Sequence, residues 1–95
     1  MGRSQEKLVN YTIQTSRKAN KIHSRIPSPY KENIKQIIEG LGLNPFPADC
    51  KKIKEVDNLY RVREGSYRIV YEVDPKALQV SIIYIDPRKD VYKSI

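Results

Sequence analysis

Apolar residues along the first part of the chain recur first with period two and then at helical spacing. Residues 9–14 alternate between apolar and polar side chains, which predicts a half-buried strand. Residues 19–26 carry apolar side chains at helical spacing, and Thr15 or Ser16 before them can act as an N-cap. Because the residue before a proline avoids the helical region, we expect this first helix to end before Pro27.

The second helix has the clearest pattern. Ser28 is a candidate N-cap, and Pro29 would take the first helical position, where its missing N–H is not needed. One continuous apolar stripe follows, made of Tyr30, Ile34, Ile37, Ile38 and Leu41. We expect Gly40 and Gly42 to end the helix and residues 43–49 to form a proline-bearing connection.

From about residue 52 onward the apolar period changes to two. Three segments with this alternation predict three successive strands, at residues 59–63, 67–73 and 78–85. The residues between them, Glu64-Gly65 and 74–76, have the composition of tight turns.

The order of these elements predicts an α+β fold. Two N-terminal helices would pack on one face of a small, mainly antiparallel sheet, in the order βααβββ with a short C-terminal tail. The chain has 95 residues, enough for one domain, which we assign to residues 8–95 after a polar tail at 1–7.

The turn at Glu64-Gly65 predicts a register for the first hairpin. With those two residues as the loop, Arg61 would lie opposite Arg68, and Arg63 opposite Ser66. One face of the hairpin would then hold a coherent core layer of Tyr60, Val62, Tyr67, Ile69, Tyr71 and Val73. The opposite face would present Arg61, Arg63 and Arg68 together.

Two directly opposed arginines destabilise a sheet by some tenths of a kcal/mol. The nearest acidic residue of the same parity is Glu72, four residues beyond Arg68. The pairing is understandable if an anion occupies the space between the guanidinium groups, which are well shaped for bidentate contact with phosphate. The alternative is that these are ordinary solvated charges on an exposed sheet face.

The charge of the whole chain supports an anionic partner. Eighteen Lys and Arg against eleven Asp and Glu give a net charge of +7, which favours nucleic acid, an anionic membrane or an acidic protein. No apolar run approaches the roughly 18 residues of a membrane span, and we expect a cytoplasmic protein. Cys50 is the single cysteine, which excludes an intramolecular disulfide and a zinc–cysteine cluster.

Two segments resemble motifs of a known family. Residues 59–73, Leu-Tyr-Arg-Val-Arg-Glu-Gly-Ser-Tyr-Arg-Ile-Val-Tyr-Glu-Val, resemble the central signature of the RelE/ParE toxin superfamily of type II toxin–antitoxin systems. Residues 85–92, Ile-Asp-Pro-Arg-Lys-Asp-Val-Tyr, resemble its closing motif. The predicted helix pair and the connection at 45–47 also fit, so the resemblance runs from about residue 8 to the end, with the RelE-like subgroup preferred.

The resemblance implies a bacterial toxin that inhibits translation as a metal-independent endoribonuclease without a cofactor. It would enter the ribosomal A site and cleave mRNA by attack of the 2′-hydroxyl on the adjacent phosphate. The implied catalytic residues are Arg61 and Arg63, where relatives often carry lysines, together with Arg68, Arg88 of the closing motif and Tyr92.

Proton transfer is the step for which the sequence departs from the family. A guanidinium does not act as a base in proteins. Acid–base catalysis would therefore depend on Lys52, Lys54, Tyr92 or the ribosome. Pro87 stands where many members carry a histidine. The basic run that contains Lys51, Lys52 and Lys54 would contact RNA phosphates, or would simply be a solvated strand start.

The implied partners are a cognate acidic antitoxin, the ribosome with its mRNA, and operator DNA only through the antitoxin complex; no membrane is expected. The rival within the superfamily is a ParE-type toxin, a non-enzymatic inhibitor of DNA gyrase on the same fold. A second rival is a plain RNA-binding module. Such a module would carry stacking aromatic residues on the arginine face, whereas the predicted parity puts the hairpin tyrosines on the core face.

Overall fold

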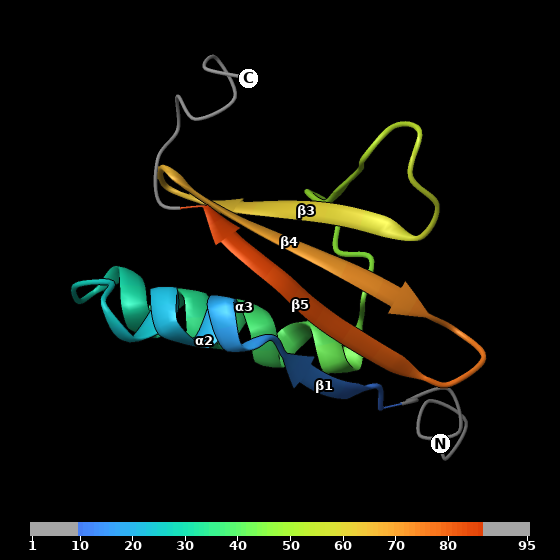
Figure 1. Ribbon diagram of the computed structural model, residues 1–95, viewed down its shortest axis with the longest axis horizontal. Coiled ribbons are helices and arrows are strands. Elements are labelled where there is room, and N and C mark those ends of the chain that lie inside the picture. Colours follow the sequence, from blue (N-terminus) through green and yellow to red (C-terminus); the bar gives the residue numbers. More distant parts are fainter. Residues whose placement is uncertain (1–9, 87–95) are drawn as a thin grey trace, which may run out of the picture.

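The computed structural model describes residues 10–86 and confirms the predicted α+β architecture. The elements in chain order are β1 (Thr12–Thr15), α2 (Arg17–Ser24), α3 (Tyr30–Leu43), β2 (Lys51–Lys52), β3 (Leu59–Glu64), β4 (Tyr67–Asp74) and β5 (Gln79–Asp86). Figure 1 shows the two helices together on one side of the sheet. Neither helix within residues 10–86 is long and apolar enough to cross a membrane. The predicted tail at 1–7 lies outside the described residues.

The five strands form one sheet in the order β1-β5-β4-β3-β2. β1 pairs with β5 in parallel, and every other neighbouring pair is antiparallel. The sequence pattern predicted four of these strands, although β1 starts at Thr12, later than predicted, because residues 10 and 11 lie outside it. The fifth, β2, is only two residues long and too short to produce a period. It extends the sheet beyond β3, along the edge that carries two of the predicted arginines.

The hydrophobic core lies between the sheet and the two helices. The predicted core layer of the hairpin is confirmed, because Val62, Ile69, Tyr71 and Val73 are buried, and Tyr60 and Tyr67 pack against them. The other buried apolar side chains are Val80, Ile82 and Ile85 of β5 and Ala19, Ile26, Ile34 and Leu41 of the helical half. The opposite face of the sheet, which we call the outer face, carries no helix among residues 10–86 (Figure 1).

Ser16 caps α2 and joins it to the sheet. Its hydroxyl accepts a hydrogen bond from the Ala19 N–H at 3.0 Å and donates one to the Ile83 carbonyl at 2.8 Å. Of the two N-caps the sequence allowed, Ser16 is therefore the one used. The helix ends at Ser24, so Ile26, which was predicted to extend it, lies beyond the end and is buried there.

The predicted limits of α3 were wrong at both ends. Pro29, not Ser28, occupies the N-cap position, and the Ser28 hydroxyl donates instead to the Glu32 carboxylate at 2.9 Å. At the other end the helix continues through Gly40 and Gly42 to Leu43.

Gly42 serves close packing and not helix termination. The Tyr11 N–H donates to the Gly42 carbonyl at 2.7 Å, and a Cβ on Gly42 would lie only 3.2 Å from the Tyr11 carbonyl oxygen. The missing side chain therefore lets the chain just before β1 approach the last turn of α3.

Candidate functional site

The β3–β4 hairpin differs in register from the sequence prediction. Its two loop residues are Gly65 and Ser66, because Glu64 pairs with Tyr67. Arg68 consequently lies opposite Arg63, not opposite Arg61 as predicted. The shift moves the pairing by two residues, so every side chain stays on its predicted face while the cross-strand partners change.

Backbone conformation explains why the loop starts at Gly65. Gly65 has φ of 62°, the left-handed region that L side chains rarely adopt, and Ser66 is not among the residues with positive φ. A two-residue hairpin loop with glycine at its first central position and an ordinary residue at the second is a favoured connection. Glu64 thus ends β3, and the glycine after it makes the turn.

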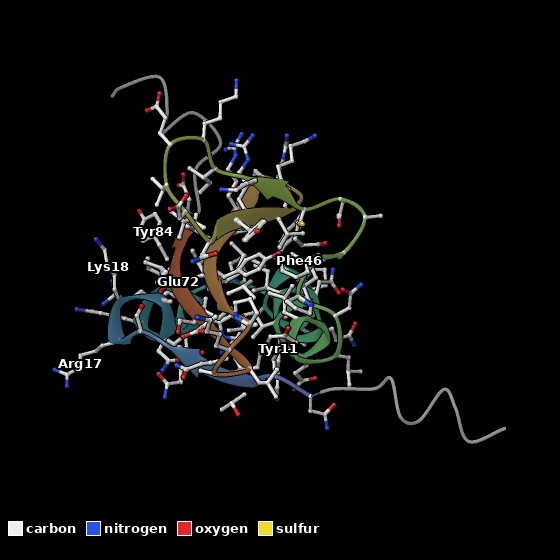
Figure 2. All side chains as sticks on the ribbon, turned by 90° about the vertical axis from the view of Figure 1, so that its right-hand side faces the viewer. Tyr11, Arg17, Lys18, Phe46, Glu72 and Tyr84 are labelled. Carbon is white, nitrogen blue, oxygen red and sulfur yellow. The ribbon has the colours of Figure 1, made fainter. Side chains whose placement is uncertain are left out.

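Two adjacent rows of the outer face gather the basic side chains. One row crosses three strands with Arg63, Arg68 and Asp86 directly opposite one another. The next row crosses four strands and consists of Lys51, Arg61, Val70 and Tyr84. We call Arg61, Arg63 and Arg68 the arginine cluster. Figure 2 shows nitrogen-bearing side chains gathered above β3, away from the helices.

Asp86 is the acidic neighbour that the sequence did not reveal. It pairs with Arg68 at the end of β5 and is only 1% exposed. Glu72, which the sequence favoured as the nearest carboxylate, is exposed and pairs with Leu59 and Ser81. The correct carboxylate was missed because a regular β5 would place Asp86 on the core face.

An irregularity in β5 produces this change of face. Val70 pairs with Tyr84 while its neighbour Tyr71 pairs with Ile82, so Ile83 is an extra residue in the β5 strand. Such a bulge reverses the alternation on the bulged strand. As a result Ile85 joins the core, and Tyr84 and Asp86 turn to the outer face.

The three side chains of the arginine cluster differ in their exposure to solvent. Arg63 is exposed, whereas Arg61 and Arg68 are half-buried, and the Nε atom of Arg68 and the Oδ2 atom of Asp86 are fully buried. A half-buried guanidinium has fewer conformations available than an exposed one. Arg68 is therefore the most fixed of the three, and Arg63 is the most accessible to a ligand.

The first turn of α3 supports the hairpin that carries these arginines. The Asn33 amide donates to the Glu64 carboxylate at 3.0 Å, next to Arg63 in β3. The Tyr30 ring packs against the Tyr67 ring with centroids 5.5 Å apart, next to Arg68 in β4. Contacts on the core face thus fix the backbone from which Arg63 and Arg68 project to the outer face.

An aromatic group behind β3 supports the second row in the same way. The Tyr60 ring lies 5.1 Å from Phe46 and 5.9 Å from Tyr71, centroid to centroid. The Tyr71 hydroxyl donates to the Pro45 carbonyl at 2.8 Å in a buried position. Burial, with a contribution from Cys50, raises the pKa of the Tyr71 phenol far above its usual value. This tyrosine is consequently a structural element, protonated throughout the physiological range.

Only one lysine of the predicted basic run joins the arginine face. Lys51 lies opposite Arg61 on the outer face, whereas Lys52 lies opposite Tyr60, with its ammonium 6.0 Å from the centre of that ring. Lys54 follows β2 in the connection to β3 and is exposed. Roles for all three lysines in RNA binding remain predictions, with Lys51 the best placed.

The structure does not locate the whole predicted site. Arg88 and Tyr92 lie outside the described residues, so their positions relative to the arginine cluster remain predictions. Tyr84, on the arginine face, was not predicted, so the expected lack of aromatic residues on this face no longer argues against a plain RNA-binding module. Alternation predicts the face of the hairpin tyrosines correctly, but in β5 the continuous apolar run 82–85 gives no sign of the change of face.

Comparison with known protein families and sequences identifies relatives over almost the whole chain. The matching family model describes the ParE toxin of the type II toxin–antitoxin system parDE and covers residues 9–92. Putative toxin RelE1 of Methanocaldococcus jannaschii is 29% identical over 89 residues, which span 90% of this chain and 99% of that protein. Toxin RelE3 of the same organism is 43% identical over 53 residues, 52% of this chain and 60% of that protein.

Solved structures with this fold lead to the same family. The toxin chain of an archaeal RelE–RelB complex from Pyrococcus horikoshii superposes with a TM-score of 0.75 and 25% identity, over 84% of this chain and 97% of that one. A RelB–RelE antitoxin–toxin complex from Methanococcus jannaschii gives a TM-score of 0.69 and 30% identity, over 86% and 98% of the two chains. The chain therefore belongs to the RelE/ParE family and is a toxin of a type II toxin–antitoxin system.

Proposed function

We propose that this toxin is a ribosome-dependent endoribonuclease that cleaves mRNA in the ribosomal A site and so inhibits translation. The observation that supports the proposal is the convergence of Arg63 and Arg68, directly opposite each other, with Arg61 and Lys51 in the adjacent row. A sheet stabilised only by its own contacts gains nothing from opposed like charges. A phosphate between the guanidinium groups turns that repulsion into attraction.

The chemistry requires a site of this kind. The 2′-hydroxyl attacks the adjacent phosphorus, its proton passes to a base, the P–O5′ bond breaks and the leaving 5′-oxygen takes up a proton. The products are a 2′,3′-cyclic phosphate and a 5′-hydroxyl. Fixed guanidinium groups meet two demands: they position the reacting atoms, and they stabilise the extra negative charge on the phosphoryl oxygens in the transition state.

Asp86 lowers the positive charge of the proposed site but does not cancel it. The two rows contain four cationic side chains and one carboxylate, so a phosphate still meets a strong excess of positive charge. The carboxylate is buried beside Arg68, while Arg63 is exposed. In the proposed site Asp86 positions Arg68, and Arg61 and Arg63 are the groups available to the incoming strand.

Arg88 and Tyr92 complete the proposed site. Arg88 would add a further guanidinium, and the Tyr92 phenol would take part in proton transfer, which no arginine can perform. Lys51 is a second candidate for this duty because it lies opposite Arg61. Lys52 and Lys54 would bind ribosomal RNA phosphates at the neighbouring edge.

The proposal includes the partners that such a toxin needs. RelE chains from Pyrococcus horikoshii and Methanococcus jannaschii have been solved in complexes with RelB. We extend this to a cognate antitoxin for the present chain, one rich in acidic residues, because the net charge of +7 attracts such a partner. Operator DNA would be contacted only through that complex, and the toxin would act in the cytoplasm.

Purified protein added to translating ribosomes, followed by primer extension along the mRNA, tests the proposal. We expect ribosome-dependent breaks that vanish in Arg68→Ala and Tyr92→Ala and persist in Lys76→Gln, which removes an exposed charge in the β4–β5 turn. Intact mRNA with the wild-type protein would refute it. Intact mRNA together with inhibited DNA gyrase supercoiling would favour the ParE-type alternative, which the description of the family model keeps open.

A further inference from the structure

The bulge at Ile83 gives the arginine face an aromatic side chain. Tyr84 lies opposite Val70, which in turn lies opposite Arg61, so all three side chains project to the outer face. Neighbouring strands are about 4.8 Å apart, which puts Tyr84 roughly 10 Å across the sheet from Arg61. Arg68 is nearer, because its direct partner on β5 is only two residues from Tyr84.

A cation from the helical layer reaches the same tyrosine. The Lys18 ammonium, on the first turn of α2, lies 5.0 Å from the centre of the Tyr84 ring. Lys18 is exposed and Tyr84 is half-buried, and Figure 2 shows the two residues side by side at one edge of the molecule. The Ser16 hydrogen bonds to β5 hold the start of α2 at this edge and so fix the approach of Lys18.

Tyr84 and Lys18 together have the chemistry of a nucleotide subsite. Proteins that hold single-stranded RNA combine cationic side chains along the backbone with aromatic rings on which bases stack. The arginine cluster supplies the first component, and Tyr84 supplies the second on the same face. Lys18 lies at the far side of the tyrosine, where a phosphate flanking the stacked base would need a cation.

We propose that Tyr84 stacks on a base of the bound RNA strand and that Lys18 contacts a phosphate flanking it. The RNA strand would then run across the sheet from the arginine cluster to the end of β5 that lies beside Lys18. This inference rests on the proposed function, since it assumes that the arginine cluster binds RNA. It adds a base-contacting element outside the reacting phosphate, and so a means of holding the mRNA in place.

Fluorescence anisotropy with a single-stranded oligouridine of about ten nucleotides, a length that one small binding face can hold, tests the subsite. We expect Tyr84→Leu to weaken binding roughly five- to a hundredfold, the loss typical of one stacked base. Tyr84→Phe keeps the ring and is expected to bind like the wild type. The slope of log K against log salt should stay unchanged in Tyr84→Leu and decrease by about 0.7 in Lys18→Gln, because only the latter loses a phosphate contact.

A second probe tests the stacking without any change to the protein. An oligouridine whose central nucleotides lack their bases keeps every phosphate, and we expect the wild type to prefer the complete RNA while Tyr84→Leu shows little preference. Equal binding of both probes by the wild type would overturn the inference even if Tyr84→Leu failed to fold. Ribosome-dependent cleavage by the wild type is measured separately. Cleavage combined with equal binding of the two probes would refute the stacking subsite and leave the proposed function intact.

Discussion

Replacing Arg63 with glutamine is expected to stabilise the fold while it weakens RNA binding. Arg63 is exposed and directly opposite Arg68, and the carboxylate in the row, Asp86, lies on the far side of Arg68. Glutamine removes the charge and keeps a side chain of similar length. The two effects have opposite signs because the same charge opposes folding and attracts the ligand.

The size of the stabilisation follows from the cross-strand geometry. Directly opposed residues have Cβ atoms about 5 Å apart, and two unit charges about 6 Å apart in water repel each other by about 0.7 kcal/mol. At an ionic strength of about 0.15 M, where the Debye length is about 8 Å, screening roughly halves this energy. We therefore expect Arg63→Gln to raise the unfolding free energy by about 0.3–0.7 kcal/mol, with the gain shrinking as salt is added.

Urea unfolding at low and high salt measures the first effect, and RNA titration measures the second. Loss of one charge-assisted contact to phosphate is worth about 1.5 kcal/mol, or about a tenfold weaker affinity. The salt slope should decrease by about 0.7 at the same time.

Lys76→Gln provides a matched control for the charge alone. Lys76 lies in the β4–β5 turn, roughly 20 Å along the strand from Arg68, well beyond the Debye length. We expect both its stability and its RNA affinity to stay close to those of the wild type. A loss of stability in Arg63→Gln at low salt, or equal effects of the two variants on RNA binding, would refute the argument that opposed arginines form the anion site.

Three further predictions concern the scaffold. Gly40→Ala should raise the unfolding free energy by up to about 1 kcal/mol, because nothing lies within 4 Å of the new methyl group. Gly42→Ala should gain less or lose stability, because its methyl group would lie 3.2 Å from the Tyr11 carbonyl oxygen. Thermal unfolding compares the two variants. Gly65→Ala should cost about 1–2 kcal/mol in urea unfolding, because its φ is 62°. Tyr71→Phe should cost about 1–3 kcal/mol at neutral pH by leaving the Pro45 carbonyl without its donor. Because the pKa of Tyr71 is raised on folding, the protonated phenol contributes stability that is fully present below about pH 10 and decreases as the pH rises further. The wild type should therefore lose stability faster than Tyr71→Phe between about pH 10 and 11.

Period-two patterning predicted the faces of the hairpin correctly and its register incorrectly. A coherent core layer requires only that alternate residues point the same way, and a shift of two residues satisfies that condition equally well. The register was decided by Gly65, whose positive φ places it at the first loop position. The sequence thus predicted that the arginines share a face but not which of them meet.

Local patterns failed where long-range packing decided the structure. Gly40 and Gly42 suggest a helix end, yet α3 continues because its last turn packs against Tyr11. The apolar run 82–85 contains no signal for the bulge, which becomes visible only when β5 is paired with β4. Both residues that this bulge adds to the outer face, Tyr84 and Asp86, were therefore missed.

The charges of the outer face provide a reason for the direction of the proposed RNA path. The arginine cluster occupies one end of the face, whereas Glu72 and Asp74 are exposed on β4 toward the other end. A polyanion that followed the strands from the arginine cluster would meet these carboxylates within about 13–20 Å. One that crossed the strands along the Arg61 row would pass Val70 before it reached Tyr84, with Lys18 beyond, and the carboxylate next to this path, Asp86, is only 1% exposed. Repulsion at one end of the sheet thus favours the same crossing direction that the stacking subsite requires.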